Sequence, residues 1–550
     1  MPVLNFKGKT AVENFHHAVP HYVLEFDPAL SELPKGRKPS LDGNLIIEGD
    51  NLLALKALLP THAGKVKCIY IDPPYNTGNE GWIYNDNLTQ PQFKEWIGRV
   101  VGKEGEDACR HDKWCCMMYP RLRVLRDLLR EDGVIFVSVD DIECARLKLM
   151  LDEVFGEDAF VANLIWKARQ FPDARATTGV STDHEYILVY GRGGDTRLRG
   201  GERDKSKYSN PDGDPRGDWM SRSILGLADA SARPNLHYPI TEPGSGREFH
   251  PPPDTGWRYQ RSKMREKVAD GRILFPARAS GRPREKVFLE ELETAFPGFP
   301  SIIDDVYTAH GTAEVGRILG NGAFPFPKPS ALIRLLLAQA TSGGDLVLDS
   351  FAGSGTTAHA VLALNAEDEG GRRFILVQMA RENEADSAED RNVCASIAAE
   401  RVRRVISGYA DRKSGTQVPP MGGSFTYARL GPPLLGDHRN WGETLPSYED
   451  LAKYVFFTDT GTHLDPKRMK PKSGKIGEHA ETSYYLLYDP GAKEGAALDQ
   501  RVLDTLAKDK NPRKVVYCEK VWVHREDLLS MRSEIGEVRT MQLPFQVRGS

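Results

Sequence analysis

Residues Val66 to Gly78 read VKCIYIDPPYNTG, and this stretch decides the fold. Its first six residues are mostly apolar, β-branched or aromatic, which is typical of a strand buried in a parallel sheet. The strand must end at Asp72-Pro73-Pro74-Tyr75, because neither proline offers an N–H to a ladder. We therefore predict a stiff loop at the carboxyl end of a strand, where open α/β sheets bind their ligands.

The groups in this loop suit the exocyclic amine of a nucleobase, which is a weak nucleophile because its lone pair is delocalised. The Asp72 carboxylate and the Pro73 carbonyl could each accept one N–H, and Asp72 would stabilise the positive charge that grows on the nitrogen. Tyr75 could stack on the base, a contact worth roughly 1–3 kcal/mol in single-stranded recognition. Asp72, Pro73, Pro74 and Tyr75 are therefore candidate catalytic residues. The alternative is a plain proline-rich turn with an exposed tyrosine.

The pattern of strand, acidic end and helix recurs around this loop, as in a doubly wound sheet. Residues 44–48 are followed by Asp50 and a leucine-rich helical segment, and residues 133–139 by Asp140-Asp141 and another helix. Asp50 has two compatible interpretations, as a ligand acceptor and as the N-cap of its helix. Residues 76–112 are too long for an ordinary connector, so we predict a functional loop over the site.

Composition limits the class of protein. Of the 550 residues, 40% are hydrophobic and 27% charged, as in soluble globular proteins of two to four domains. No apolar run approaches the roughly 18–20 residues of a membrane span, and the N-terminus lacks the apolar core of a signal peptide. The seven cysteines have no CxxC spacing, so we expect a reducing cytoplasm and no metal site.

Positive charge is local. The net charge is −4, yet residues 256–288 hold ten Lys or Arg against three acids, a surplus of seven. Trp257, Tyr259 and Phe275 are interleaved with these basic residues, as in surfaces that contact phosphates and read grooves. Candidate DNA-binding residues are Arg258, Arg261, Lys263 and Arg265. The alternative is an ordinary solvated basic surface.

Regular patterning returns near residue 321. A predicted strand at 345–348 leads into Asp349-Ser350-Phe351-Ala352-Gly353-Ser354-Gly355-Thr356-Thr357 and then a helix. Glycines at such a turn let a ligand approach the backbone, and the helix N-terminus favours a negative group. No lysine follows the glycines, so the turn is not a phosphate-binding P-loop, and the third glycine of a dinucleotide fingerprint is absent.

The two motifs together resemble those of DNA amino-methyltransferases that use S-adenosylmethionine. The order, with D-P-P-Y before the glycine turn and a variable basic region between them, resembles the β class of N6-adenine methyltransferases. Stretches such as IEGDNLLALKAL, YPRLRVLRDLL, DGVIFVSVDDIE and HEYILVY are similar to modification subunits of type III restriction systems. The resemblance covers roughly residues 40–190 and 320–410.

The resemblance implies an α/β fold with a doubly wound, mostly parallel, Rossmann-like sheet of seven strands. It divides the chain into an N-terminal arm (1–40), a methyltransferase domain in two parts (41–191 and 321–410), an inserted target recognition domain (192–320) and a C-terminal α+β segment of unknown role (411–550).

Site residues also follow from the resemblance. It places Asp50 near the adenosine end of S-adenosylmethionine and Lys328 near its carboxylate. Many relatives have an acid for the ribose where this chain has Gln378, so that contact differs here. The methionine part of the cofactor would lie against Asp349, Phe351, Ala352, Gly353, Ser354, Gly355 and Thr356.

The expected function is transfer of a methyl group to N6 of an adenine flipped out of double-stranded DNA, in a restriction-modification or phage-defence system of a bacterium or archaeon. Expected partners are DNA, a second copy in a homodimer and a separate restriction or defence subunit. The alternatives are an N4-cytosine methyltransferase, which the acid at position 72 disfavours, a specificity subunit with little activity of its own, an RNA or protein-glutamine methyltransferase, and a nucleotide-dependent oxidoreductase.

Overall fold

The computed structural model describes residues 3–76, 107–381 and 391–544, apart from short gaps at 175, 177, 202–203, 228, 279, 293–297, 436–440, 442–444 and 492–494. The chain divides into two units, Arg199–Phe299 and the remainder. No helix within the described ranges is long and apolar enough to span a membrane. Most of the functional loop predicted over 76–112 lies outside the described residues.

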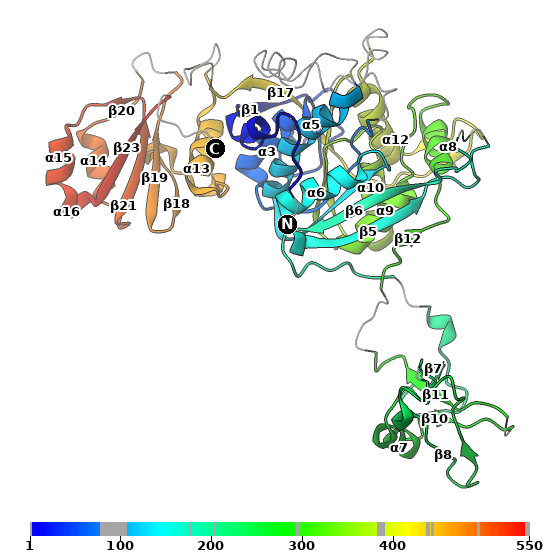
Figure 1. The fold of residues 1–550 in the computed structure, drawn as a ribbon. Coiled ribbons are helices and arrows are strands. Elements are labelled where there is room, and N and C mark those ends of the chain that lie inside the picture. Colours follow the sequence, from blue (N-terminus) through cyan, green and yellow to red (C-terminus); the bar gives the residue numbers. More distant parts are fainter. Residues whose placement is uncertain are drawn as a thin grey trace. The chain divides into compact units, whose positions relative to one another are not determined.

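The larger unit is built on a sheet of ten strands (Figure 1). Two of them, β1 and β6, run against the other eight. The strands in spatial order are β1 (Tyr22–Phe26), β17 (Thr426–Pro433), β2 (Leu45–Glu48), β14 (Arg373–Gln378), β13 (Leu346–Asp349), β3 (Val66–Ile71), β4 (Leu129–Val139), β6 (His184–Gly191), β5 (Phe160–Lys167) and β12 (Ile302–Ile303).

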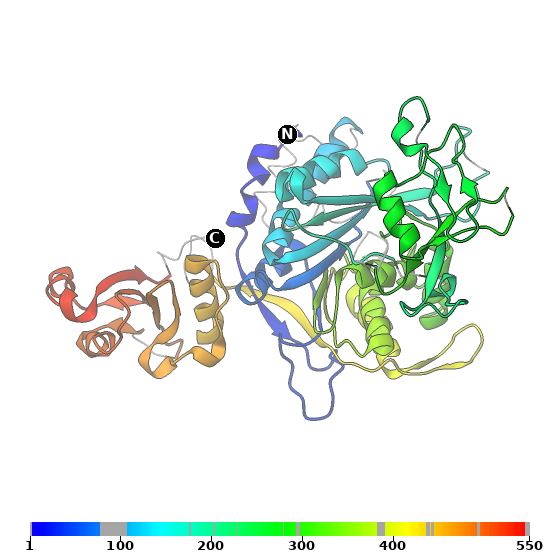
Figure 2. The ribbon, with the colours of Figure 1, turned by 90° about the horizontal axis from the view of Figure 1, so that it is seen from below.

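Helices cover both faces of this sheet (Figure 2). On one face, Ile69 and Ile71 of β3 share a core with α3 (Asn51–His62), α5 (Asp107–Leu128) and α6 (Cys144–Phe155). Because side chains alternate along a strand, the buried Tyr70 faces the opposite side. There α9 (Ser330–Ala340) contacts β3 and β4, and α10 (Thr356–Asp368) contacts β14. Burial on both faces explains why these strands read as continuous apolar runs.

The sheet is larger than the seven strands that the resemblance implies. The predicted N-terminal arm supplies β1, and β17 lies beyond the boundary predicted at residue 410. β17 pairs in parallel with β2 through Tyr427↔Ile46 and Ala428↔Ile47, so it covers the backbone edge of β2. At the other edge, β12 follows the inserted unit and pairs with β5. The α/β class and the mostly parallel sheet agree with the prediction.

The reversed strand β6 matters for the site. It pairs with β4 so that Tyr186 lies opposite Val139, the last residue of β4. The first residues of β6, His184 and Glu185, therefore reach the edge at which β3 and β4 end. One antiparallel strand thus places the polar side chains of its first residues at the edge where two parallel strands end.

The smaller unit contains a three-stranded antiparallel sheet of β10 (Ile273–Leu274), β11 (Arg284–Phe288) and β7 (Trp219–Ser223). Its helix α7 (Arg261–Ala269) buries Met264 in a core with Ile224 and Trp257. A second pair of strands, β8 (Ile240–Thr241) and β9 (Glu248–Phe249), has only two residues in each strand. Such short elements explain why the sequence shows little periodicity here.

The C-terminal part has a four-stranded sheet of its own, in the order β18 (Lys475–His479), β19 (Thr482–Leu487), β21 (Arg513–Cys518) and β23 (Glu537–Gln542). One face packs Tyr484 against α13 (Tyr448–Thr460). The other face packs Tyr485 against α14 (Gln500–Leu506).

The turn from β2 into α3 depends on Asp50. Its Oδ1 accepts hydrogen bonds from the N–H groups of Leu52 (2.9 Å) and Leu53 (3.1 Å), so Asp50 is the N-cap of α3. Its Oδ2 lies 3.1 Å from the guanidinium of Arg121, which is fully buried. One carboxylate therefore caps a helix and neutralises a buried cation.

We expect Asp50→Ala to lower the free energy of unfolding by about 3 kcal/mol or more, because the cap is worth about 1 kcal/mol and an unpaired buried charge costs about 3 kcal/mol. Asp50→Asn is the matched variant, since asparagine caps equally well and removes only the charge. Urea unfolding followed by circular dichroism measures both. Equal losses for the two variants would mean that the cap contributes nothing.

Candidate functional site

The D-P-P-Y residues form the turn that follows β3. The Trp114 indole N–H donates to the Pro74 carbonyl (2.7 Å), and the buried Asn76 closes the turn with φ of +62°. The Asn76 amide donates to Glu143, which is itself fully buried (2.5 Å). Within the described ranges, the Pro73 carbonyl accepts no hydrogen bond. Trp114 and Glu143 thus hold the turn in place. Among the described residues, none occupies the Pro73 carbonyl, which is one of the two predicted acceptors.

Lys328 joins this turn from the other half of the chain. Its Nζ lies 2.9 Å from Asp72 Oδ1, 2.8 Å from Asp72 Oδ2 and 2.8 Å from the Tyr75 hydroxyl, to which it donates. The same ammonium lies 4.8 Å from the centre of the Tyr75 ring. The resemblance places Lys328 near the cofactor carboxylate, whereas here its side chain binds Asp72.

Glu185 completes the cluster, and the sequence patterns did not identify it. Its Oε2 lies 2.8 Å from the Tyr75 hydroxyl and 3.3 Å from Lys328 Nζ. The Tyr75 hydroxyl is also 2.8 Å from Asp72 Oδ1, so its single proton is donated to one carboxylate at a time. The available signal was an acid at the start of the apolar run HEYILVY. To interpret this acid, one would have to know that β6 lies beside β4 and runs antiparallel to it.

The surroundings of Tyr75 and Lys328 in this cluster shift the pKa values of both side chains. Burial, followed by the negative charges of Asp72 and Glu185, raises the pKa of Tyr75 well above its usual value. Burial alone would lower the pKa of Lys328, but the carboxylates of Asp72 and Glu185 outweigh it and raise that pKa. Tyr75 is therefore a neutral phenol and Lys328 a cation at neutral pH.

The second motif is the turn between β13 and α10. Gly353 and Gly355 have φ of +50° and +78°, a region that favours glycine. A Cβ on Gly355 would lie 3.0 Å from the Ala398 carbonyl, and one on Gly353 would lie 3.3 Å from the Phe324 ring. Backbone conformation and close packing therefore both require glycine here.

Asp349 and Gln378 brace this glycine turn. The buried Asp349 accepts hydrogen bonds from the Phe351 N–H (2.9 Å) and the Thr357 hydroxyl. Burial raises the pKa of Asp349 to about 7, although both hydrogen bonds oppose the shift. Gln378 accepts a hydrogen bond from the Gly353 N–H at 2.7 Å. The amide therefore supports the turn itself.

The turn touches both neighbouring parts of the candidate site. The Thr356 hydroxyl donates to the Lys328 carbonyl (3.2 Å), so Lys328 contacts the glycine turn at its backbone and Asp72 at its ammonium. The Asn51 amide donates to the Ser350 carbonyl (3.0 Å), which brings Asp50 and its helix beside the turn. The predicted residues from three distant segments therefore meet at one edge of the sheet.

Arg401 is a second residue that the sequence patterns missed. It is the second residue of α12 (Glu400–Ser407) and is fully buried. Its guanidinium donates to the hydroxyls of Ser354 (2.9 Å) and Thr356 (2.8 Å) and pairs with Glu314 of α8 (Thr308–Ile318) at 2.9 Å. It thus fixes two hydroxyls of the glycine turn, those of Ser354 and Thr356. Its neighbours Glu400, Arg403 and Arg404 are also charged, so the sequence gave no sign that this one arginine is buried.

The four candidate DNA-binding residues lie in the smaller unit and are exposed. Lys263 pairs with Glu266 (2.8 Å), and the Arg261 guanidinium lies 5.8 Å from the centre of the Tyr238 ring. Within the described part of the chain, Arg258 and Arg265 form no ion pair. These two side chains are the most available to an anionic partner.

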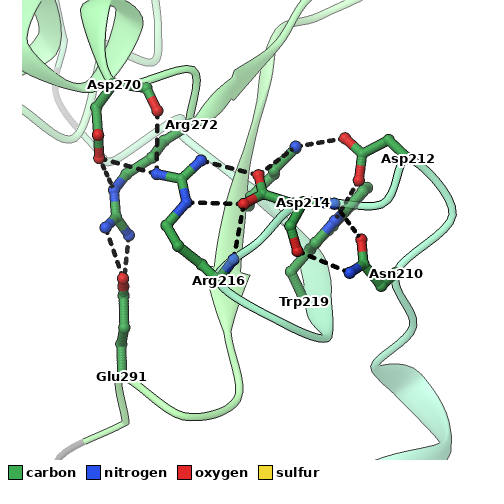
Figure 3. A network of polar contacts seen from close by, with 9 residues as sticks. Asn210, Asp212, Asp214, Arg216, Trp219, Asp270, Arg272 and Glu291 are labelled. Carbon is green, nitrogen blue, oxygen red and sulfur yellow. Dashed lines mark hydrogen bonds and ion pairs between the residues drawn. The ribbon is translucent and has the colours of Figure 1, made fainter.

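Much of the predicted basic surplus is neutralised inside this unit. Figure 3 shows Arg216 between Asp214 and Asp270, and Arg272 between Asp270 and Glu291. Lys286 belongs to the same network, since it is buried and pairs with Asp212 and Asp214. Antiparallel pairing of β11 with β7 brings these charges together. Lys286 and Arg272 are therefore structural.

Comparisons with known proteins agree on the kind of protein. The N6_N4_Mtase family model, described as DNA methylase, matches residues 66–389. The chain is 36% identical over 384 residues to the Mod subunit of the type III restriction-modification enzyme StyLTI of Salmonella typhimurium, covering 66% of this chain and 57% of that protein. It is 33% identical to the EcoPI Mod subunit of Escherichia phage P1, covering 68% of this chain and 63% of that protein.

The chain thus spans about three fifths of the length of these relatives. Among solved structures, PvuII DNA methyltransferase (cytosine-N4-specific) aligns over 64% of this chain and 88% of that chain, at 13% identity and a TM-score of 0.32. The family match covers both the D-P-P-Y turn and the glycine turn, and the chain therefore belongs to the DNA methylase family.

Proposed function

We propose that this chain is a DNA methyltransferase that transfers a methyl group from S-adenosylmethionine to N6 of an adenine in double-stranded DNA. The observation that carries this proposal is the meeting of the Asp72–Tyr75 turn with the glycine turn through Lys328. The hydrogen-bond acceptors of the Asp72–Tyr75 turn, which suit an amine, then lie at the same edge of the sheet as the glycine turn, which suits a small molecule.

The turn after β3 suits an amine nucleophile. The Pro73 carbonyl, which accepts no hydrogen bond within the described ranges, and the Asp72 carboxylate can each take one N–H. Such contacts draw the nitrogen lone pair away from the ring and towards an electrophile. A base within a duplex cannot reach this turn, so the proposal requires that the adenine be flipped out and stacked on Tyr75.

The residues of the glycine turn fit S-adenosylmethionine, which supplies an activated methyl group when bound. The Ser350 hydroxyl is buried there without a hydrogen-bond partner among the described residues, so the turn has a polar group to offer. We assign the cofactor to Asp50, Asp349, Phe351, Ala352, Gly353, Ser354, Gly355, Thr356 and Gln378. A role for Lys328 at the cofactor carboxylate would require its ion pair with Asp72 to break.

We assign DNA recognition to the inserted unit, within the region predicted over 192–320, and chemistry to the seven strands β2, β14, β13, β3, β4, β6 and β5. Arg258, Arg261, Lys263 and Arg265 are exposed on the inserted unit, which supports this division. The role of residues after 433 stays open.

We further propose that the chain is the modification component of a restriction-modification system, with a separate restriction subunit and a second copy as partners. This rests on the curated relatives, which are named Mod subunits of type III enzymes.

The direct test is transfer of labelled methyl from S-adenosylmethionine to amplified, unmethylated genomic DNA, followed by digestion to nucleosides. We expect the label in N6-methyl-2′-deoxyadenosine. Label in N4-methylcytosine would replace the adenine assignment, and an absence of labelled DNA would overturn the proposal.

For Asp72 we expect the variant Asp72→Asn to reduce single-turnover methyl transfer by about 10²–10³-fold, because a preorganised negative charge at the growing cation is lost. Asp72→Ala should abolish transfer. S-adenosylmethionine binding, measured by calorimetry, should stay nearly unchanged, since the glycine turn holds the cofactor. Wild-type turnover by either variant would contradict the mechanism.

For the glycine turn we expect Gly353→Val to remove S-adenosylmethionine binding. A side chain there meets the Phe324 ring and must adopt a φ of +50°. Gly371→Val is the matched control, because Gly371 has φ of +64° but nothing within 4 Å of its Cβ position. Calorimetry on both folded proteins is decisive, and normal binding by Gly353→Val would make the turn purely structural.

For the inserted unit we expect Arg258→Ala and Arg265→Ala to weaken DNA binding while leaving the unfolding temperature unchanged. If each contacts a phosphate, the slope of log K against log salt should fall by about one unit. If either contacts a base edge, it should instead relax preference at one base pair. Lys286→Ala is the contrasting variant and should destabilise the unit. DNA binding unaffected by both arginine changes would move recognition elsewhere.

A further inference from the structure

We propose that Glu185 is a second catalytic carboxylate, which takes the proton that the target amine must lose during methyl transfer. This inference rests on the proposed function and adds a residue to its chemistry. It is carried by the place of Glu185 in the polar cluster around Lys328.

The fold brings Glu185 to the reacting edge. As the second residue of the reversed strand β6, it lies one position beyond Tyr186, which pairs with the last residue of β4. Its carboxylate is 2.8 Å from the Tyr75 hydroxyl, and that hydroxyl is 2.8 Å from Asp72. Two carboxylates from different strands thus share one tyrosine.

The Lys328 ammonium marks a position for an N–H donor in this cluster. Lys328 Nζ lies 2.8 Å from Asp72 Oδ2 and 3.3 Å from Glu185 Oε2. A donor nitrogen close to this point would meet the same two acceptors. An exocyclic amine held by Asp72 would therefore have Glu185 as its second carboxylate neighbour.

The chemistry needs such an acceptor. The amine lone pair forms the new N–C bond while the C–S bond breaks, and the electron pair of that bond stays on sulfur. The nitrogen, which began with two hydrogens, becomes a cation and must lose one proton. The Glu185 carboxylate accepts this proton, becomes a neutral carboxylic acid and releases the proton to water after the product leaves.

The other members of the cluster are poorly suited to this step. Lys328 is already a cation, and Tyr75 is a neutral phenol that donates a hydrogen bond. Each oxygen of Asp72 already accepts a hydrogen bond from Lys328, and the remaining capacity of this carboxylate is used to hold one N–H of the amine. By contrast, Glu185 Oε1 accepts no hydrogen bond from any described residue, so it retains a free site for a proton.

The test compares Glu185→Gln with a matched variant, Glu153→Gln, in single-turnover methylation of amplified genomic DNA. Glu153 has the same kinds of partner as Glu185, since it accepts hydrogen bonds from Tyr119 (2.9 Å) and Lys9 (2.7 Å). The side chains are also similarly exposed, at 18% for Glu153 and 19% for Glu185. Glutamine keeps the shape and the hydrogen-bond acceptor but cannot take a proton.

We expect Glu185→Gln to slow methyl transfer by about 100-fold or more, with DNA binding and calorimetric S-adenosylmethionine binding unchanged, and Glu153→Gln to keep the wild-type rate. Formate should restore part of the rate in Glu185→Ala but not in Glu185→Gln, because only the shorter side chain leaves room for an added carboxylate. A near wild-type rate for Glu185→Gln would overturn the inference. A wild-type protein that methylates no DNA would instead overturn the proposed function.

Discussion

The ion cluster of Lys328 with Asp72 and Glu185 is the contact on which the arrangement of the site depends. It joins a loop after β3, the start of β6 and the segment before α9, which are far apart in the chain. A charged lysine that is only 10% exposed is tolerable because two carboxylates compensate its lost hydration. Removing either acid would leave a cation short of partners, so the three segments must come together as the protein folds.

The same cluster has an electrostatic consequence. Two carboxylates against one ammonium leave one negative charge in excess beside the Tyr75 ring. This excess opposes the binding of anions and favours any group that gains positive charge. An amine that becomes cationic as it reacts is such a group, whereas a phosphate is not. The cluster thus favours a reacting amine at this edge of the sheet and disfavours a phosphate there. Phosphate binding needs a positively charged surface elsewhere.

The sequence predicted the central sheet well because its signals are local. Buried parallel strands appear as short apolar runs, and the run at 66–71 is strand β3 without any shift. Asp50 likewise proved to be the N-cap that its position suggested. Glu185 and Arg401 escaped prediction because their roles come from partners more than 40 residues away. The edge strands β1 and β17 escaped for the same reason, since strand pairing leaves no mark in either segment alone.

The charge of the inserted unit shows a different limit of sequence reasoning. Counting charges within 256–288 gave a surplus of seven, but the acids that neutralise Arg272 and Lys286 lie outside that window, at Glu291, Asp212 and Asp214. The hairpin-like pairing of β7, β10 and β11 brings them together. What remains exposed is a smaller set of arginines, so in the proposed role of this unit the affinity for DNA should depend on few residues. In that proposed role, single substitutions among these arginines would change the base preference, while the acids and glycines of the larger unit stay fixed by their own contacts.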